Sequence, residues 1–140
     1  MNGMPVVHSD SAIAAALRRA QVGGLLPRWM VGSGRIRRLE ATAFIVPGSG
    51  DRTEYAGRLA GRTNDYESWD GRIAWIEPDG RAEHLVAIVD RYGQVYEVTS
   101  AADAAGLPSA DALEEWFRFL ATACPECGVL DDPTPRDWVP

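Results

Sequence analysis

Two short turn sequences separate three strand-like runs in the second half of this chain. The turns are Pro78-Asp79-Gly80 and residues 90–93. Both carry the Asp and Gly residues that tight turns favour, and the first also carries Pro. The runs are residues 72–76, 83–89 and 94–99, rich in β-branched, aromatic and other apolar side chains. Because a parallel crossover needs roughly a dozen residues or more, connections this short predict antiparallel neighbours.

Two further runs extend the predicted sheet toward the N-terminus. Residues 39–46 are mostly apolar or β-branched and end at Pro47, and a turn-rich stretch follows. Residues 54–59 then alternate between apolar and polar side chains, which predicts a half-buried strand paired with the first run. We interpret residues 63–71 as a loop.

Helical periodicity is clearest near the two ends of the chain. Residues 11–22 follow capping side chains and stop at a pair of glycines, and residues 110–123 follow Ser109. The second helix has one apolar face, formed by Leu113, Trp116, Phe117 and Leu120. The sequence therefore predicts an α+β fold: a mostly antiparallel sheet of about five strands, with an N-terminal helix and a C-terminal helix packed on it.

The length of 140 residues and the 46% hydrophobic content predict a single folded domain over residues 1–140, with an irregular C-terminal tail from about residue 129. No apolar run reaches the roughly 20 residues that cross a bilayer. The two cysteines are too close in sequence to staple a secreted framework, so we expect a cytoplasmic protein without a membrane partner.

Charge is distributed unevenly along the chain. All 14 basic residues are arginines, which removes enzyme classes that depend on lysine, such as phosphate-binding loops ending in Gly-Lys-Ser/Thr. Residues 1–70 hold 9 arginines against 7 acids, and residues 71–140 hold 5 arginines against 13 acids. The acidic second half repels nucleic-acid phosphates and favours a basic protein partner.

Cys124 and Cys127 form the most specific local pattern, since two thiolates spaced C-x-x-C can face one zinc ion. Four ligands would require His8 and His84, the only histidines, to converge on the pair. We expect no metal, cofactor or catalytic set here. The alternatives are a small metal-binding or redox domain built on this pair, and an enzyme whose carboxylates carry no sequence signature.

Five tryptophans are many for a chain of this length, and Trp69 and Trp138 lie in segments predicted as loops. Aromatic side chains concentrate binding energy at protein contacts. We therefore expect a partner-binding surface that includes Trp69, Trp138 and the rim acids Asp131 and Asp132.

Residues 72–124 combine paired strands, the turn at residues 90–93, the strand Gln94-Val95-Tyr96-Glu97-Val98 and the helix beginning after Ser109. This segment resembles small α+β bacterial toxin-immunity proteins of the SUKH-like type. The resemblance implies a non-enzymatic protein that binds and neutralises a toxin with its surface and without a cofactor. It assigns no functional residue, because no motif matches residue by residue.

Overall fold

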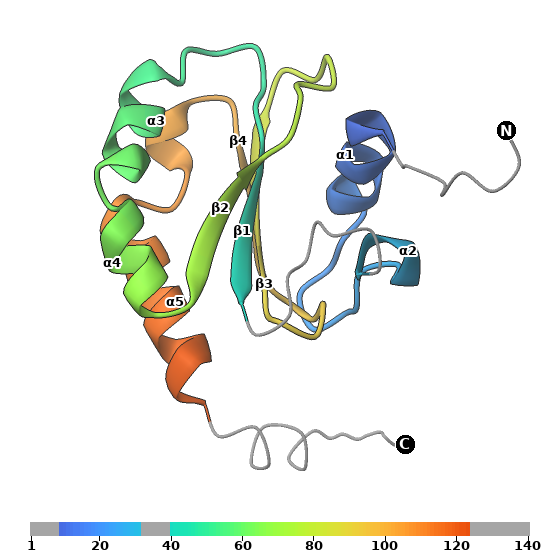
Figure 1. The fold of residues 1–140 in the computed structure, drawn as a ribbon. Coiled ribbons are helices and arrows are strands. Elements are labelled where there is room, and N and C mark those ends of the chain that lie inside the picture. The colour runs from blue at the N-terminus through green and yellow to red at the C-terminus, as the bar shows by residue number, and fades with distance from the viewer. Residues whose placement is uncertain (1–8, 32–39, 124–140) are drawn as a thin grey trace, which may run out of the picture.

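The computed structural model describes residues 9–31 and 40–123 (Figure 1). A sheet of four strands occupies its centre, in the order β2-β1-β3-β4. The strands are β1 (Ala41–Val46), β2 (Gly71–Trp75), β3 (His84–Val89) and β4 (Val95–Ala101). The predicted α+β class is confirmed, whereas the predicted five strands become four among the described residues.

The sheet is mixed, so the predicted antiparallel character is matched only in part. Residues 72–76 and 83–89, predicted as antiparallel neighbours, do not pair, because β1 lies between β2 and β3. Strand β1 pairs in parallel with β2, while β3 pairs antiparallel with both β1 and β4. All six residues of β1 and all six of β3 are buried. Their continuous apolar sequences match this environment, because a central strand covered on both faces needs no polar alternation.

Two segments differ from their sequence prediction. Residues 54–59, predicted as a strand, lie within helix α3 (Thr53–Ala60), and the predicted loop 63–71 contains helix α4 (Thr63–Ser68) and the start of β2. Tyr55 and Leu59 are buried on α3. Their spacing of four residues places them on one helical face, so the same apolar residues that alternate in a strand pattern also satisfy a helix.

Helix α1 (Asp10–Arg18) covers one face of the sheet with the short helix α2 (Arg28–Val31) beside it (Figure 1). The Ser9 hydroxyl caps α1 by accepting a hydrogen bond from the backbone N–H of Ala12 at 3.2 Å. Arg18 then anchors the helix, donating two hydrogen bonds to the Asp79 carboxylate at 2.9 and 3.0 Å. The predicted N-terminal helix is confirmed, although it ends four residues earlier than expected.

Helices α3, α4 and α5 (Ala110–Thr122) cover the opposite face (Figure 1). Ser109 caps α5 as predicted, and a single 3₁₀ turn, η1 (Ala104–Gly106), precedes it. Leu113 and Phe117 of α5 are fully buried, while Trp116 is only partly buried. The sheet therefore separates two apolar cores, one under α1 and one under α3 to α5.

No helix in the described ranges is long and apolar enough to cross a membrane. The tail predicted from about residue 129 lies outside the described residues.

Candidate protein-binding surface

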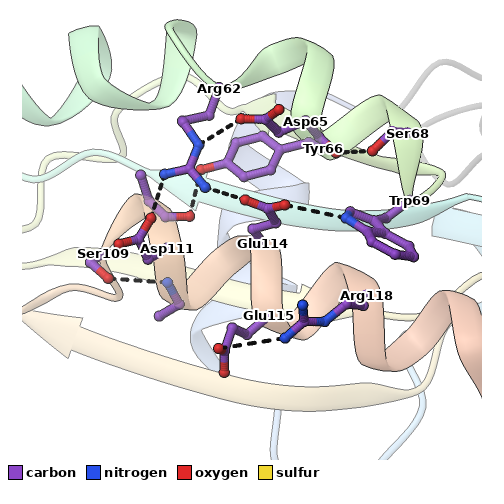
Figure 2. Close-up of polar contacts among 12 residues, drawn as sticks. Arg62, Asp65, Tyr66, Ser68, Trp69, Ser109, Asp111, Glu114, Glu115 and Arg118 are labelled. Carbon is purple, nitrogen blue, oxygen red and sulfur yellow. Dashed lines mark hydrogen bonds and ion pairs between the residues drawn. The ribbon is translucent and has the colours of Figure 1, made fainter.

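Arg62, the residue before α4, joins three carboxylates from two helices (Figure 2). Its Nε donates to Asp65 Oδ2 at 2.9 Å, within α4, and its Nη1 donates to Asp111 Oδ1 at 2.5 Å, in the first turn of α5. Its Nη2 donates to Glu114. The guanidinium fork thus ties the start of α4 to the start of α5.

The Arg62 network, defined as Arg62 with Asp65, Asp111 and Glu114, carries more negative than positive charge. Hydrogen bonds to Asp111, then to Glu114 and Asp65, raise the pKa of Arg62 above its ordinary value, so this cation is fixed. One positive charge faces three acids, and the side chain of Asp111 is 85% exposed. The network therefore presents net negative charge to solvent and complements a basic partner.

Trp69, predicted as a partner-facing anchor, is only partly buried. It ends α4, packs against the core under α5, and its indole Nε1 donates to Glu114 Oε2 at 3.3 Å (Figure 2). Trp69 is thus joined to the Arg62 network through its hydrogen bond to Glu114. The other predicted contact residues, Trp138, Asp131 and Asp132, lie outside the described residues.

An aromatic cluster occupies the other flank of α5. Tyr96 of β4, Trp116 and Phe119 form three edge-to-face pairs, with ring centroids 5.9 to 6.3 Å apart. Phe119 is 55% exposed. Burial, reinforced by the neighbouring charge of Asp90, raises the pKa of Tyr96, so its hydroxyl stays neutral.

This aromatic cluster was not predicted from the sequence, although the position of Phe119 relative to Phe117 pointed to it. Phe119 lies two positions from the buried Phe117, and such an offset turns a side chain well away from the core face of a helix. An aromatic residue on the outward side of an amphipathic helix is the kind of exposed apolar group that marks contact surfaces. The α5 surface, defined as the Arg62 network, the aromatic cluster and Glu115 between them, combines acidic and aromatic groups. Glu115 is 74% exposed and pairs with Arg118 at 3.6 Å, so the excess negative charge of the surface comes from the Arg62 network (Figure 2).

The described residues form no set of ligands that would support the metal hypothesis. Among residues 9–31 and 40–123, no group of three or more His, Cys, Asp or Glu side chains could hold a metal ion. His84 is 1% exposed, and its Nδ1 accepts a hydrogen bond from the Gly48 N–H at 2.8 Å. His8, Cys124 and Cys127 lie outside the described residues.

An open pocket of about 210 Å³ lies where β1 and β2 end, lined by Pro47, Arg52, Trp75 and Glu77 among others. An enzyme based on paired carboxylates needs two acids facing one substrate. This pocket contains a single acid, Glu77, and so does not provide that arrangement.

Comparison of the chain with protein-family models, curated proteins and solved structures finds no match.

Proposed function

We propose that this chain is a non-enzymatic, cytoplasmic protein-binding domain whose basic partner docks on the α5 surface. The observation that carries the proposal is the exposed Phe119, packed beside Trp116 and Tyr96 and flanked by a network with excess negative charge. Protein interfaces combine a desolvated aromatic anchor with a charged rim in this way. Neutralisation of a basic toxin, the role implied by the SUKH-like resemblance, is the specific form of this proposal.

The two parts of the surface support different steps of binding. Acids at the rim attract a basic partner and speed its association, and this effect weakens as salt screens the charges. A buried aromatic anchor mainly slows dissociation. The α5 surface supplies Asp111 and Glu115 for the first step and Phe119 for the second.

The experiment is affinity capture from the native cell extract, identification of the captured protein by mass spectrometry, and measurement of binding rates with the purified pair. Phe119→Ala should accelerate dissociation and weaken binding by roughly 2 kcal/mol. Glu115→Gln should mainly slow association, more strongly at low salt. Trp75→Ala, on a tryptophan that is 39% exposed at the opposite edge of the sheet, is the matched control. Equal affinity of the Phe119 variant and the parent protein would exclude this surface.

A further inference from the structure

Strand β4 is an edge strand whose outer side is paired only at its beginning in the described structure. There, Val95 donates to the Gly24 carbonyl at 2.8 Å and accepts from the Gly23 N–H at 2.8 Å. The backbone of residues 23–26 thus pairs with this edge through one isolated bridge, and no segment in the described part of the chain pairs with the rest of it.

The hydrogen-bond pattern of the sheet identifies which backbone groups of β4 point away from β3. The Ile45 carbonyl accepts a hydrogen bond from the residue after β2, so the backbone groups of Ile45 face β2 rather than β3. Its cross-strand neighbour Val86 therefore directs its own groups to β4, where Thr99 is its partner. Because successive residues face opposite edges, the N–H and C=O groups of Val98 and Ser100 point outward.

Apart from the single charge of Glu97, this edge lacks the features that keep strands from pairing. Its sequence, VYEVTSA, contains no proline, lysine or arginine, whereas exposed edges are usually blunted by such residues. The bulge in β4 lies near Val95, before the open part. Ser100 is exposed to solvent, and the opposite edge strand β2 is shorter and carries Arg72.

We infer that the outward-facing Val98 and Ser100 bind an extended, basic segment of the partner, which adds a fifth strand to the sheet. The inference rests on the proposed function, because it assigns a binding mode to that protein partner. Charge selects the occupant: Glu97 lies on the strand, the Arg62 network on α4 and α5 holds three acids against one cation, and the chain carries a net charge of −6. A second copy would bring like charges together, whereas a basic strand gains both main-chain hydrogen bonds and charge complementarity.

The direct test uses a defined probe, a peptide of alternating lysine and valine about eight residues long, which matches an ordinary strand. Hydrogen exchange of the isotope-labelled protein is followed by NMR. In the free protein the amides of Val98 and Ser100 should exchange rapidly and that of Thr99 slowly, and the peptide should protect the first two. The controls are the same peptide N-methylated at alternate residues and a glutamate-valine peptide, and neither should protect these amides.

Three results would overturn the inference: no protection of Val98 and Ser100, equal protection by the N-methylated peptide, or protection that rises with protein concentration alone. The last would assign the edge to a second copy of this chain.

A substitution separates the edge from the α5 surface. Ser100→Pro removes one outward N–H without removing a ladder bond to β3, whereas Ser100→Val keeps that N–H. Loss of one main-chain hydrogen bond should weaken peptide and partner binding about fivefold in the proline variant only. If Phe119→Ala weakens partner binding and Ser100→Pro does not, the proposed function stands and the edge inference fails. If the peptide protects the edge while Phe119→Ala has no effect on the partner, the α5 surface assignment fails and the edge remains.

Discussion

Two buried tyrosine hydroxyls join α3 and α4 to the segment that begins α5. Tyr55 donates to the Pro108 carbonyl and Tyr66 donates to the Ala110 carbonyl, each at 2.9 Å. Both rings lie in the core under α5, where Tyr66 also meets Phe117 edge-to-face with centroids 5.1 Å apart. Burial raises the pKa of both tyrosines, and that of Tyr66 reaches about 12. Ionisation of either hydroxyl would replace a donor by a buried charge beside a carbonyl oxygen.

These tyrosines predict a loss of stability at alkaline pH. The pKa of Tyr66 is higher in the folded protein than the ordinary value of about 10 in the unfolded chain. Its contribution is therefore complete below pH 10 or so and is lost as the pH rises toward about 12. Tyr66→Phe should cost about 1 kcal/mol at neutral pH and make unfolding less pH-dependent above pH 10. Urea unfolding at a series of pH values tests this, and an unchanged slope would contradict it.

At the scale of elements, the sequence predicted secondary structure best where its pattern fitted a helix or a strand but not both. Helix α5 follows the helical period, and β3 and β4 are short runs bounded by turn residues, which favours strands. The segment around Tyr55 and Leu59 satisfies both periods, and tertiary packing decides for a helix. Because this segment is helical, α3 and α4 form the crossover that the parallel β1–β2 pair requires, and the predicted pairing of residues 54–59 with residues 39–46 is wrong.

Substitutions at two glycines test these assignments of helix and strand. A Cβ added at Gly57, inside α3, meets nothing within 4 Å, so Gly57→Ala should stabilise the protein by roughly 0.5–1 kcal/mol. At Gly71, where β2 begins, a Cβ would lie 2.3 Å from Phe117 Cγ, so Gly71→Ala should destabilise it by roughly 1–3 kcal/mol. Denaturant unfolding measures both. Destabilisation by Gly57→Ala would favour the strand predicted from the sequence.

The candidate surface was predicted only in its general character. An acidic second half and surface aromatic groups were expected from the sequence, and α5 carries the exposed Asp111 and the exposed Phe119. The hydrogen bond from Trp69 to Glu114 could not be predicted, because it joins the end of α4 to a helix that lies 45 residues further along the chain. The Tyr96–Phe119 contact joins two elements that only the folded sheet places together, so no local pattern encodes it.

Within α5, the neighbouring residues Trp116 and Phe117 should contribute differently to the free energy of unfolding. Phe117 is fully buried between Tyr66 and the start of β2, whereas Trp116 is partly exposed in the aromatic cluster. Phe117→Ala should cost roughly 3–5 kcal/mol of unfolding free energy. Trp116→Ala should cost less, about 1–2 kcal/mol, because part of its ring remains in water. Chemical unfolding of both variants measures the difference, and a larger loss for Trp116 would contradict this placement of the helix.

At the scale of the whole molecule, one sheet supports two cores. Strand β1 directs Phe44 and Val46 into the core under α1, and Ala43 and Ile45 into the core under α5. Strand β3 divides its side chains between the same two cores. Loss of either core would expose one face of both central strands to water. The two layers are therefore expected to unfold together.

This coupling predicts a single unfolding transition that substitutions on either face of the sheet shift. Leu17, on α1, and Leu113, on α5, are both fully buried, and Leu→Ala at either position should cost roughly 2–5 kcal/mol. In each variant, tryptophan fluorescence and far-ultraviolet circular dichroism should report coincident denaturant midpoints, since a two-state domain gives the same transition with every probe. Separated midpoints in the Leu17 variant, with the α5 layer persisting after α1 has unfolded, would show that the cores are independent. Coincidence in the parent protein and in both variants would show that β1 and β3 transmit the loss of one core to the other.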